Sequence, residues 1–246
     1  MLTEICKIGP FTIYSYGLML VIAFFVCSYL ASLQAKREGV DSDVMINLFF
    51  VVFISGIIGA RIFYVLNHFS DYLGNPLEIF VLSRGGLAWF GGIIFGSLSA
   101  VIFIKIKKLS ILRVSDLIIP FIALGQAIGR IGCLLNGCCY GRESAYGIYF
   151  KVFDQYLIPT QLYSSLFLLL IFFILRFIQK RKHTTGVILA VYFFLYSLKR
   201  FFIEYLRNDT PRDYYGLTIF QLLSLAMFII SILIFVKIFR SKNKKS

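Results

Sequence analysis

Residues 114–136 read VSDLIIPFIALGQAIGRIGCLLN, an apolar run long enough to cross a membrane as one helix, since a bilayer requires about 20 such residues. Near its end the run contains Arg130, with glycines at three nearby positions: Gly125, Gly129 and Gly132. An arginine stays charged inside a membrane and costs several kcal/mol there, so it indicates a functional site. The pattern raises the question of which anion Arg130 binds.

The whole chain is as apolar as this run. Of its 246 residues, 59% are hydrophobic and 15% are charged, and the mean hydropathy is +0.83. This composition excludes a soluble globular protein and indicates a polytopic membrane protein. We predict an all-α fold in a single integral membrane domain, residues 1–246, with a short basic tail at 240–246. The predicted transmembrane helices number about seven and cover residues 14–34, 43–66, 86–104, 114–136, 160–178, 186–206 and 217–238.

The chain carries a net charge of +13, and the positions of its basic residues explain this excess. Most of them fall on alternate loops and in the C-terminal tail. By the positive-inside rule, the C-terminus is therefore expected in the cytoplasm and the N-terminus outside. The positive charges follow the first apolar run instead of preceding it, so we expect that run to be a retained helix. The basic excess is thus a matter of topology and lipid contact, and no nucleic-acid partner is predicted.

Three predicted helices carry an arginine in the half that this topology places toward the outer face: Arg61, Arg130 and Arg200. Snorkelling to the headgroups explains any one of them. It does not explain the small residues beside Arg61 and Arg130, which allow close packing or leave room for a ligand. We therefore predict that the three converge on a cavity for a polyanion, most simply a phospholipid phosphate. Other polar residues at this level or at helix ends are Tyr16, Tyr64, Arg84, Asn136, Lys199, Glu204 and Arg207.

The sixth predicted helix places Arg200, Glu204 and Arg207 on one face, because they are four and three residues apart. The carboxylate can then fix the orientation of the Arg200 guanidinium. An ordinary ion pair that stabilises the helix near the membrane interface is the alternative.

Cysteines form a second cluster, with Cys133, Cys138 and Cys139 close to Arg130. Their spacing lacks the Cys-x2-Cys pairs typical of zinc sites, so no metal is predicted. Simple packing of small apolar thiols is one interpretation. A reactive thiol or a disulfide is the other, since the outer face is oxidising and Arg130 favours a thiolate.

At these residues the chain resembles the prolipoprotein diacylglyceryl transferase family. The resemblance covers nearly the whole chain in order, and it is this ordered set that is specific. The segments that carry it are Tyr16 to Met19, Gly59 to Arg61, Gly85 to Gly92, Gly129 to Gly137, Pro159 to Tyr163, and Arg200 to Arg207.

The resemblance implies a multi-pass enzyme of the bacterial inner (cytoplasmic) membrane that carries out the first step of lipoprotein maturation. It transfers the diacylglyceryl group of phosphatidylglycerol to the lipobox cysteine in the signal peptide of a preprolipoprotein, and no cofactor is implied. Arg130, Arg200 and Glu204 are the expected catalytic residues. The expected substrate-binding residues are Arg130, Arg61, Tyr16, Asn136, Gly86, Arg207 and Gln161.

Three positions depart from the family pattern. Phe90 stands where the family commonly has a histidine, and Cys133 and Cys138 stand where it commonly has asparagine and glutamate. No general base can be assigned from the motif. We hypothesise that Glu204, or the developing phosphate itself, accepts the thiol proton.

Other functions fit some of these features. A divergent relative could act on another thiol or acceptor, with Cys138 or Cys139 as a covalent intermediate. An anion or lipid transporter would also need intramembrane arginines and helices interrupted by glycine, but no inverted repeat is evident and the arginines lie toward one face. A thiol-redox membrane protein would rest on the cysteines alone, and the usual Cys-x-x-Cys spacing is absent.

Overall fold

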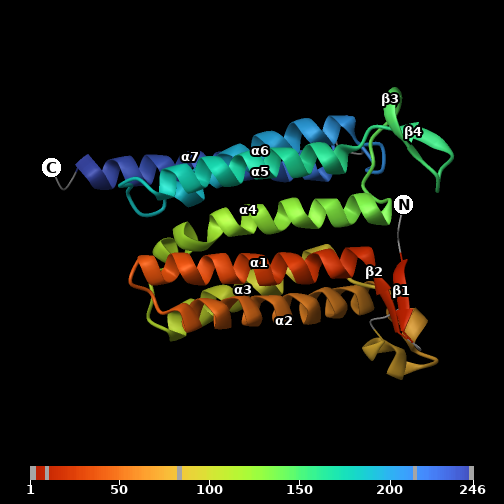
Figure 1. Ribbon diagram of the computed structural model, residues 1–246, viewed down its shortest axis with the longest axis horizontal. Helices are drawn as coiled ribbons and strands as arrows, with labels where there is room; N and C mark the ends of the chain where they lie inside the picture. Colours follow the sequence, from red (N-terminus) through yellow and green to blue (C-terminus); the bar gives the residue numbers. More distant parts are fainter. Residues whose placement is uncertain (1–3, 9–10, 82–84, 213–214, 244–246) are drawn as a thin grey trace.

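A computed structural model describes residues 4–8, 11–81, 85–212 and 215–243 of the chain. Arg84 lies outside these residues. The described chain forms long α-helices that lie side by side (Figure 1). Their bounds fall within a few residues of the seven predicted helices, which confirms the all-α prediction. The helices are α1 (Ser15–Arg37), α2 (Ser42–Asn67), α3 (Trp89–Ile106), α4 (Ile111–Asn136), α5 (Thr160–Gln179), α6 (Val187–Leu206) and α7 (Ile219–Asn243).

Six helices of the described chain are long and apolar enough to cross a membrane. The exception is α6, which carries three charged residues in its second half: Lys199, Arg200 and Glu204. Large apolar side chains such as Phe25, Phe173 and Leu233 point outward and are more than half exposed. Such an apolar outer surface suits contact with lipid and identifies a multi-pass membrane protein.

Two short hairpins accompany the helices. In the first, β1 (Glu4–Ile8) pairs antiparallel with β2 (Phe11–Tyr14), and in the second, β3 (Glu143–Phe150) pairs with β4 (Gln155–Leu157). Two 3-10 turns, η1 (Phe69–Tyr72) and η2 (Pro76–Phe80), follow α2. All of these lie at one end of the helices, and the last turns of α7 lie at the opposite end (Figure 1). The sequence did not predict these hairpins and turns, because they are much shorter than the apolar runs of about 20 residues that indicate transmembrane helices.

The tightest packing lies away from the hairpins. One buried cluster joins the end of α1 and the starts of α2 and α4 through Ala35, Met45 and Leu117. A second joins α4, α5 and α6, with Ile171 and Ile188 among its members. The helices are therefore held together at the end that bears the basic loops, and the opposite half of the bundle is free to enclose a cavity.

A buried carboxylate ties α6 to α4 at this packed end. The Asp116 side chain accepts hydrogen bonds from the backbone N–H groups of Gly186 and Leu189, at 2.5 and 3.0 Å. These N–H groups lie at the start of α6, where the helix itself provides no partners. Asp116 thereby fixes the helix that carries Arg200 relative to the helix that carries Arg130.

Candidate functional site

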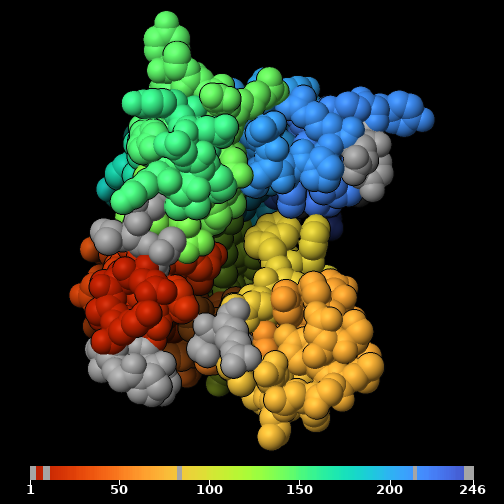
Figure 2. Space-filling model, turned by 90° about the vertical axis from the view of Figure 1, so that its right-hand side faces the viewer, coloured from red at the N-terminus to blue at the C-terminus, as the bar shows by residue number. Residues whose placement is uncertain are grey.

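A cavity of about 670 Å³ lies between the helices, toward the hairpin end. Figure 2 looks at that end and shows a hollow between the green and blue half of the molecule and the red-to-yellow half. Phe49, Phe121 and Leu168 belong to its deeper, apolar wall. Most of the polar side chains, and all of the cations, come from the helix ends nearer the hairpins or from the turns that follow them. The residues of this rim are Tyr16, Arg130, Cys133, Cys139, Lys199, Arg200 and Arg207. A charged rim above an apolar interior suits an anionic amphiphile.

Arg130 is the cation of this rim that has no partner among the described residues. It lies near the end of α4 and is half-buried, and no hydrogen bond or ion pair involves its side chain within the described chain. The neighbouring Gly129 also lines the cavity, and a Cβ placed there would meet nothing within 4 Å. Arg130 therefore has space beside it for a ligand, as the neighbouring glycines predicted.

Arg200 is held in place by Glu204. Its Nη2 lies 3.1 Å from the Glu204 Oε2, and its guanidinium lies over the ring of Phe220 at 4.4 Å. Glu204 is fully buried, and its Oε1 accepts hydrogen bonds from the hydroxyls of Thr210 and Thr218. Glu204 is not among the described residues that line the cavity. Its geometry favours a positioning role over the predicted contact with substrate.

Two further cations complete the rim. Arg207 donates two hydrogen bonds to the Asp209 carboxylate, at 2.8 and 2.7 Å, and its Nε lies 4.0 Å from Glu204. Lys199 is 7% exposed, and its Nζ lies 4.8 Å from the centre of the Tyr196 ring. Four cations thus face the cavity, and two carboxylates of the described chain, Glu204 and Asp209, contact them, so the rim attracts anions.

The structure places Arg61 apart from the other arginines. Its guanidinium donates hydrogen bonds to five backbone carbonyls of the segment after α2, at 2.7 to 3.1 Å: those of Glu78, Ile79, Val81, Gly85 and Gly86. All five of its N–H donors are thereby used. Arg61 lines a separate cavity of about 140 Å³ with Tyr64 and Gly86. The predicted convergence therefore holds for Arg130 and Arg200 but not for Arg61, which organises the loop between α2 and α3.

Gly86 belongs to the same loop. Its φ is +83°, and a Cβ there would lie 2.4 Å from the Arg61 Nη1. Only glycine fits this close approach in this backbone conformation. Gly86 therefore contacts Arg61, and neither residue is among the described residues of the large cavity.

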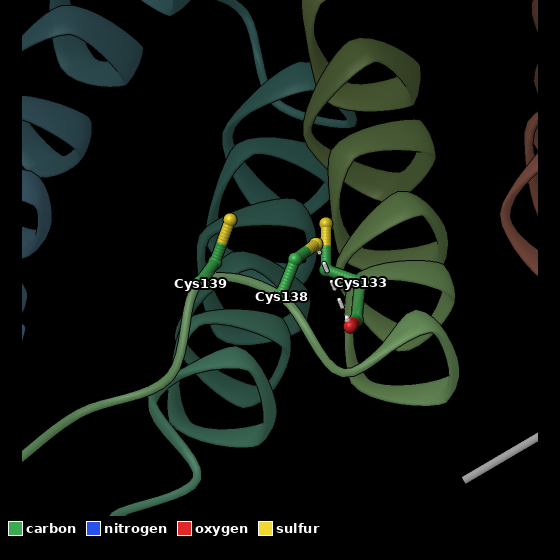
Figure 3. A group of neighbouring side chains, drawn as sticks. All are labelled: Cys133, Cys138 and Cys139. Carbon is green, nitrogen blue, oxygen red and sulfur yellow. Dashed lines mark hydrogen bonds between the residues drawn. The ribbon is translucent and has the colours of Figure 1, made fainter. Parts of the chain in front are cut away.

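The three cysteines meet at the end of α4 (Figure 3), and their sulfurs all lie within 4.8 Å of one another. The helix ends at Gly137 in the left-handed conformation, φ +74°, and the N–H of Cys138 donates to the carbonyl of Cys133 at 3.2 Å. This C-terminal turn folds Cys138 and Cys139 back toward Cys133. Hydrogen bonds from the thiols of Cys133 and Cys138, followed by the charges of Arg207 and Arg130, lower the pKa of the Cys139 thiol.

The start of α5 holds this turn in place. The Gln161 Nε2 donates to the carbonyl of Cys138, and the Thr160 hydroxyl donates to the carbonyl of Cys139, each at 2.6 Å. Gln161 is fully buried. Neither Gln161 nor Asn136, the last residue of α4, is among the described cavity-lining residues, whereas Tyr16 is.

The sequence did not assign Lys199 a role in the cavity. It was noted only as a basic residue in or near the end of a helix, although its position beside Arg200 in an apolar helix indicates a shared site. Trp89 packs edge-on against Phe90 at 5.2 Å, and both line the cavity. Phe90 therefore adds apolar wall at a position where the resembled family commonly has an ionisable side chain.

Known proteins match nearly the whole chain. A sequence model of the family described as "Prolipoprotein diacylglyceryl transferase" matches residues 3–237. A protein of Clostridium kluyveri is 41% identical over 214 residues, which cover 83% of this chain and 84% of the relative. A protein of Clostridium botulinum is 36% identical over 96% of this chain and 97% of the relative. A protein of Oceanobacillus iheyensis is 34% identical over 92% of this chain and 84% of the relative. All three relatives are named phosphatidylglycerol–prolipoprotein diacylglyceryl transferase.

Proposed function

Because the chain belongs to the prolipoprotein diacylglyceryl transferase family, we propose that it transfers the diacylglyceryl group of phosphatidylglycerol to a protein thiol. The acceptor is the lipobox cysteine in the signal peptide of a preprolipoprotein. This reaction is the first step of lipoprotein maturation. The names of the relatives support both substrates, and the cavity supports the lipid donor in particular.

The observation that carries the proposal is the unpartnered Arg130 at the rim of an apolar cavity. Phosphatidylglycerol has one phosphate charge and two acyl chains, so its phosphate suits the rim and its chains suit the wall. A guanidinium binds two phosphate oxygens at once, and no side chain or carbonyl of the described residues occupies the donors of Arg130. Arg200, held by Glu204, provides a second cation whose orientation is set before the lipid arrives.

The chemistry requires charge to be stabilised where it develops. The acceptor sulfur forms a bond to the diacylglyceryl carbon that carries the phosphate, and the bond from that carbon to the phosphate oxygen breaks. Its electron pair stays on the oxygen, and the thiol proton ends on the released glycerol phosphate. Cations already fixed around the leaving phosphate lower the barrier, because they need no reorganisation during the reaction.

The location follows from the same proposal. The basic loops lie at the end of the bundle opposite the hairpins, and the positive-inside rule assigns that end to the cytoplasm. The rim of the cavity then lies toward the outer leaflet of the bacterial cytoplasmic membrane. A secreted precursor presents its cysteine at that level when its signal peptide has entered the membrane.

Purified protein with phosphatidylglycerol and a lipobox peptide tests the proposal. The peptide is expected to gain the mass of a diacylglyceryl group. Arg130→Gln should lower the rate about 10² to 10³-fold, the usual effect of losing one stabilising donor. Arg113→Gln, an exposed arginine on the same helix, is the matched control and should keep the wild-type rate.

Two results would contradict the proposal. One is a wild-type rate in the Arg130→Gln protein. The other is the absence of any modified peptide while the protein moves phosphatidylglycerol across a liposome membrane, which would favour a lipid transporter instead.

A further inference from the structure

The cysteine cluster has no role in the chemistry described so far. Cys133, Cys138 and Cys139 bring three sulfurs to within 4.8 Å of one another. The left-handed Gly137 and the bonds from Thr160 and Gln161 impose this arrangement on the backbone. Cys139 itself adopts a left-handed conformation, φ +63°, which is uncommon for a residue with a side chain. Packing of small apolar side chains needs none of these constraints.

The spacing of the sulfurs is close to that of a metal site. At a zinc–sulfur distance of about 2.3 Å, tetrahedral geometry puts two sulfurs about 3.8 Å apart. Side-chain rotations bring sulfurs within 4.8 Å to that distance. Three thiolates around a divalent cation leave a net negative charge, and Arg130 and Arg207 line the same cavity. The surroundings therefore compensate the charge that such a site would carry.

The cluster also lacks a fourth protein ligand. Among the described residues, no further Cys, His, Asp or Glu side chain belongs to the group. Structural zinc sites have four protein ligands, whereas catalytic sites keep one position open. Cys133 and Cys139 line the large cavity, so an open position would face the space in which the phosphate and the acceptor thiol meet.

We propose that Cys133, Cys138 and Cys139 bind a thiophilic divalent cation such as Zn²⁺, and that its open position binds the acceptor thiol of the peptide. This inference rests on the proposed transferase function. It differs from the expectation drawn from the spacing of the cysteines, because the turn after α4, and not a Cys-x-x-Cys pair, brings the ligands together.

Such a site would activate the acceptor thiol, a role that Phe90 leaves open because it is not ionisable and that Glu204 leaves open because it does not line the cavity. A thiol that binds Zn²⁺ loses its proton, because the metal charge stabilises the thiolate. The metal-bound sulfur then forms the bond to the diacylglyceryl carbon, and the electron pair of the broken carbon–oxygen bond leaves on the phosphate. The proton ends on glycerol phosphate, and the metal does not change its oxidation state.

Cobalt binding tests the site independently of activity. Purified full-length protein, stripped with a chelator, should bind one Co²⁺ per chain and show the sulfur-to-cobalt charge-transfer absorption of a thiolate site. Cys138→Ser and Cys139→Ser should weaken cobalt binding by about tenfold or more. Cys6→Ser, which removes an exposed cysteine outside the cluster, should leave it unchanged. A Zn²⁺-dependent rise in the melting temperature of the wild-type protein gives a second measurement that needs no variant.

A lipobox peptide tests the open position. The peptide should increase the charge-transfer absorption of the cobalt protein, and a peptide with serine in place of the cysteine should not. The proposal is overturned if the wild-type protein binds no Co²⁺ or Zn²⁺, including the case in which two of the thiols form a disulfide. It is also overturned if cobalt binds but the peptide thiol leaves the spectrum unchanged.

The outcomes separate this inference from the proposed function. If metal-free protein transfers diacylglyceryl at the full rate, the proposed role of the metal in the reaction is wrong and the transferase stands. If cobalt binds and responds to the peptide thiol but no diacylglyceryl product forms, the thiol site stands and the proposed function fails.

Discussion

The fully buried carboxylate of Glu204 lies 3.1 Å from the guanidinium of Arg200, one turn earlier on α6. Both charges lie inside the protein, where an ion left without its partner is costly. Thr210 and Thr218 complete the surroundings of the carboxylate. The pair therefore fixes Arg200 at the rim of the cavity, and Glu204 acts through it.

We expect Glu204→Gln to destabilise the protein and to slow the reaction. Losing one partner of a buried ion pair typically costs about 3 to 5 kcal/mol. Thermal unfolding in detergent should show the loss of stability, and rates measured over a range of pH separate two roles. A positioning residue lowers the rate at every pH and leaves the shape of the profile unchanged. Loss of one limb of the profile would instead identify Glu204 as the base.

Lys199→Met should make the protein more stable and less active. Lys199 is 7% exposed and has only the ring of Tyr196 near its ammonium among the contacts of the described chain. Methionine fills a similar volume without a buried charge and should stabilise the protein by about 1 kcal/mol or more. Loss of one rim cation should raise the KM for phosphatidylglycerol about tenfold.

The control for this variant is Lys105→Met, which removes an exposed lysine at the end of α3. Differential scanning fluorimetry and initial rates are measured on both proteins. A lower melting temperature in the Lys199→Met protein, with unchanged KM, would show that the ammonium has a structural role instead.

The sequence was sufficient to predict the helices and part of the site. Apolar runs of about 20 residues have few alternatives to spanning helices, so their bounds were nearly right. Arg130 and Arg200 were expected in one cavity because both lie in apolar helices at similar depth, and both line it. The position of a residue within an apolar run indicates how deep it lies in the membrane.

The pattern does not encode which neighbour a side chain meets. Arg61 has the same depth as the others, but the loop between α2 and α3 folds back and occupies its donors. The threonines that hold Glu204 come from beyond the end of α6. Likewise, the cysteines converge through a turn whose geometry depends on Gly137 and on hydrogen bonds from α5. The spacing of apolar residues along a helix does not predict contacts that are made by loops.

Arg61→Lys should destabilise the loop between α2 and α3. An ammonium has three donors in place of five, so at least two of the carbonyls that Arg61 now satisfies lose their partner. Each buried carbonyl left unsatisfied costs about 1 to 3 kcal/mol. Limited proteolysis should therefore cut within residues 68–88 faster than in the wild-type protein.

This variant also distinguishes the two roles considered for Arg61. If Arg61 binds the lipid phosphate directly, lysine should retain the stability of the loop and raise only the KM for phosphatidylglycerol. Unchanged proteolysis with a raised KM would therefore contradict the loop-organising role.

Gly59→Ala should separate α2 from α3. The two helices touch through Gly59 and Gly91, and a Cβ on Gly59 would lie 2.3 Å from the Phe95 Cβ and 2.7 Å from the Gly91 carbonyl oxygen. Neither atom can move without shifting a helix, so we expect a loss of about 1 to 3 kcal/mol or more. Because Arg61 follows two residues later, activity should fall with stability.

Gly56→Ala is the matched control, one turn earlier on the same helix. A Cβ there would lie 3.6 Å from the Gly92 carbonyl oxygen, an ordinary contact. Alanine also favours the helix by about 0.5 to 1 kcal/mol over glycine. The Gly56→Ala protein should therefore be at least as stable as the wild type in thermal unfolding. A Gly59→Ala protein of equal stability would mean that α2 and α3 are free to move apart, and that close packing at Gly59 does not hold the loop of Arg61 in place.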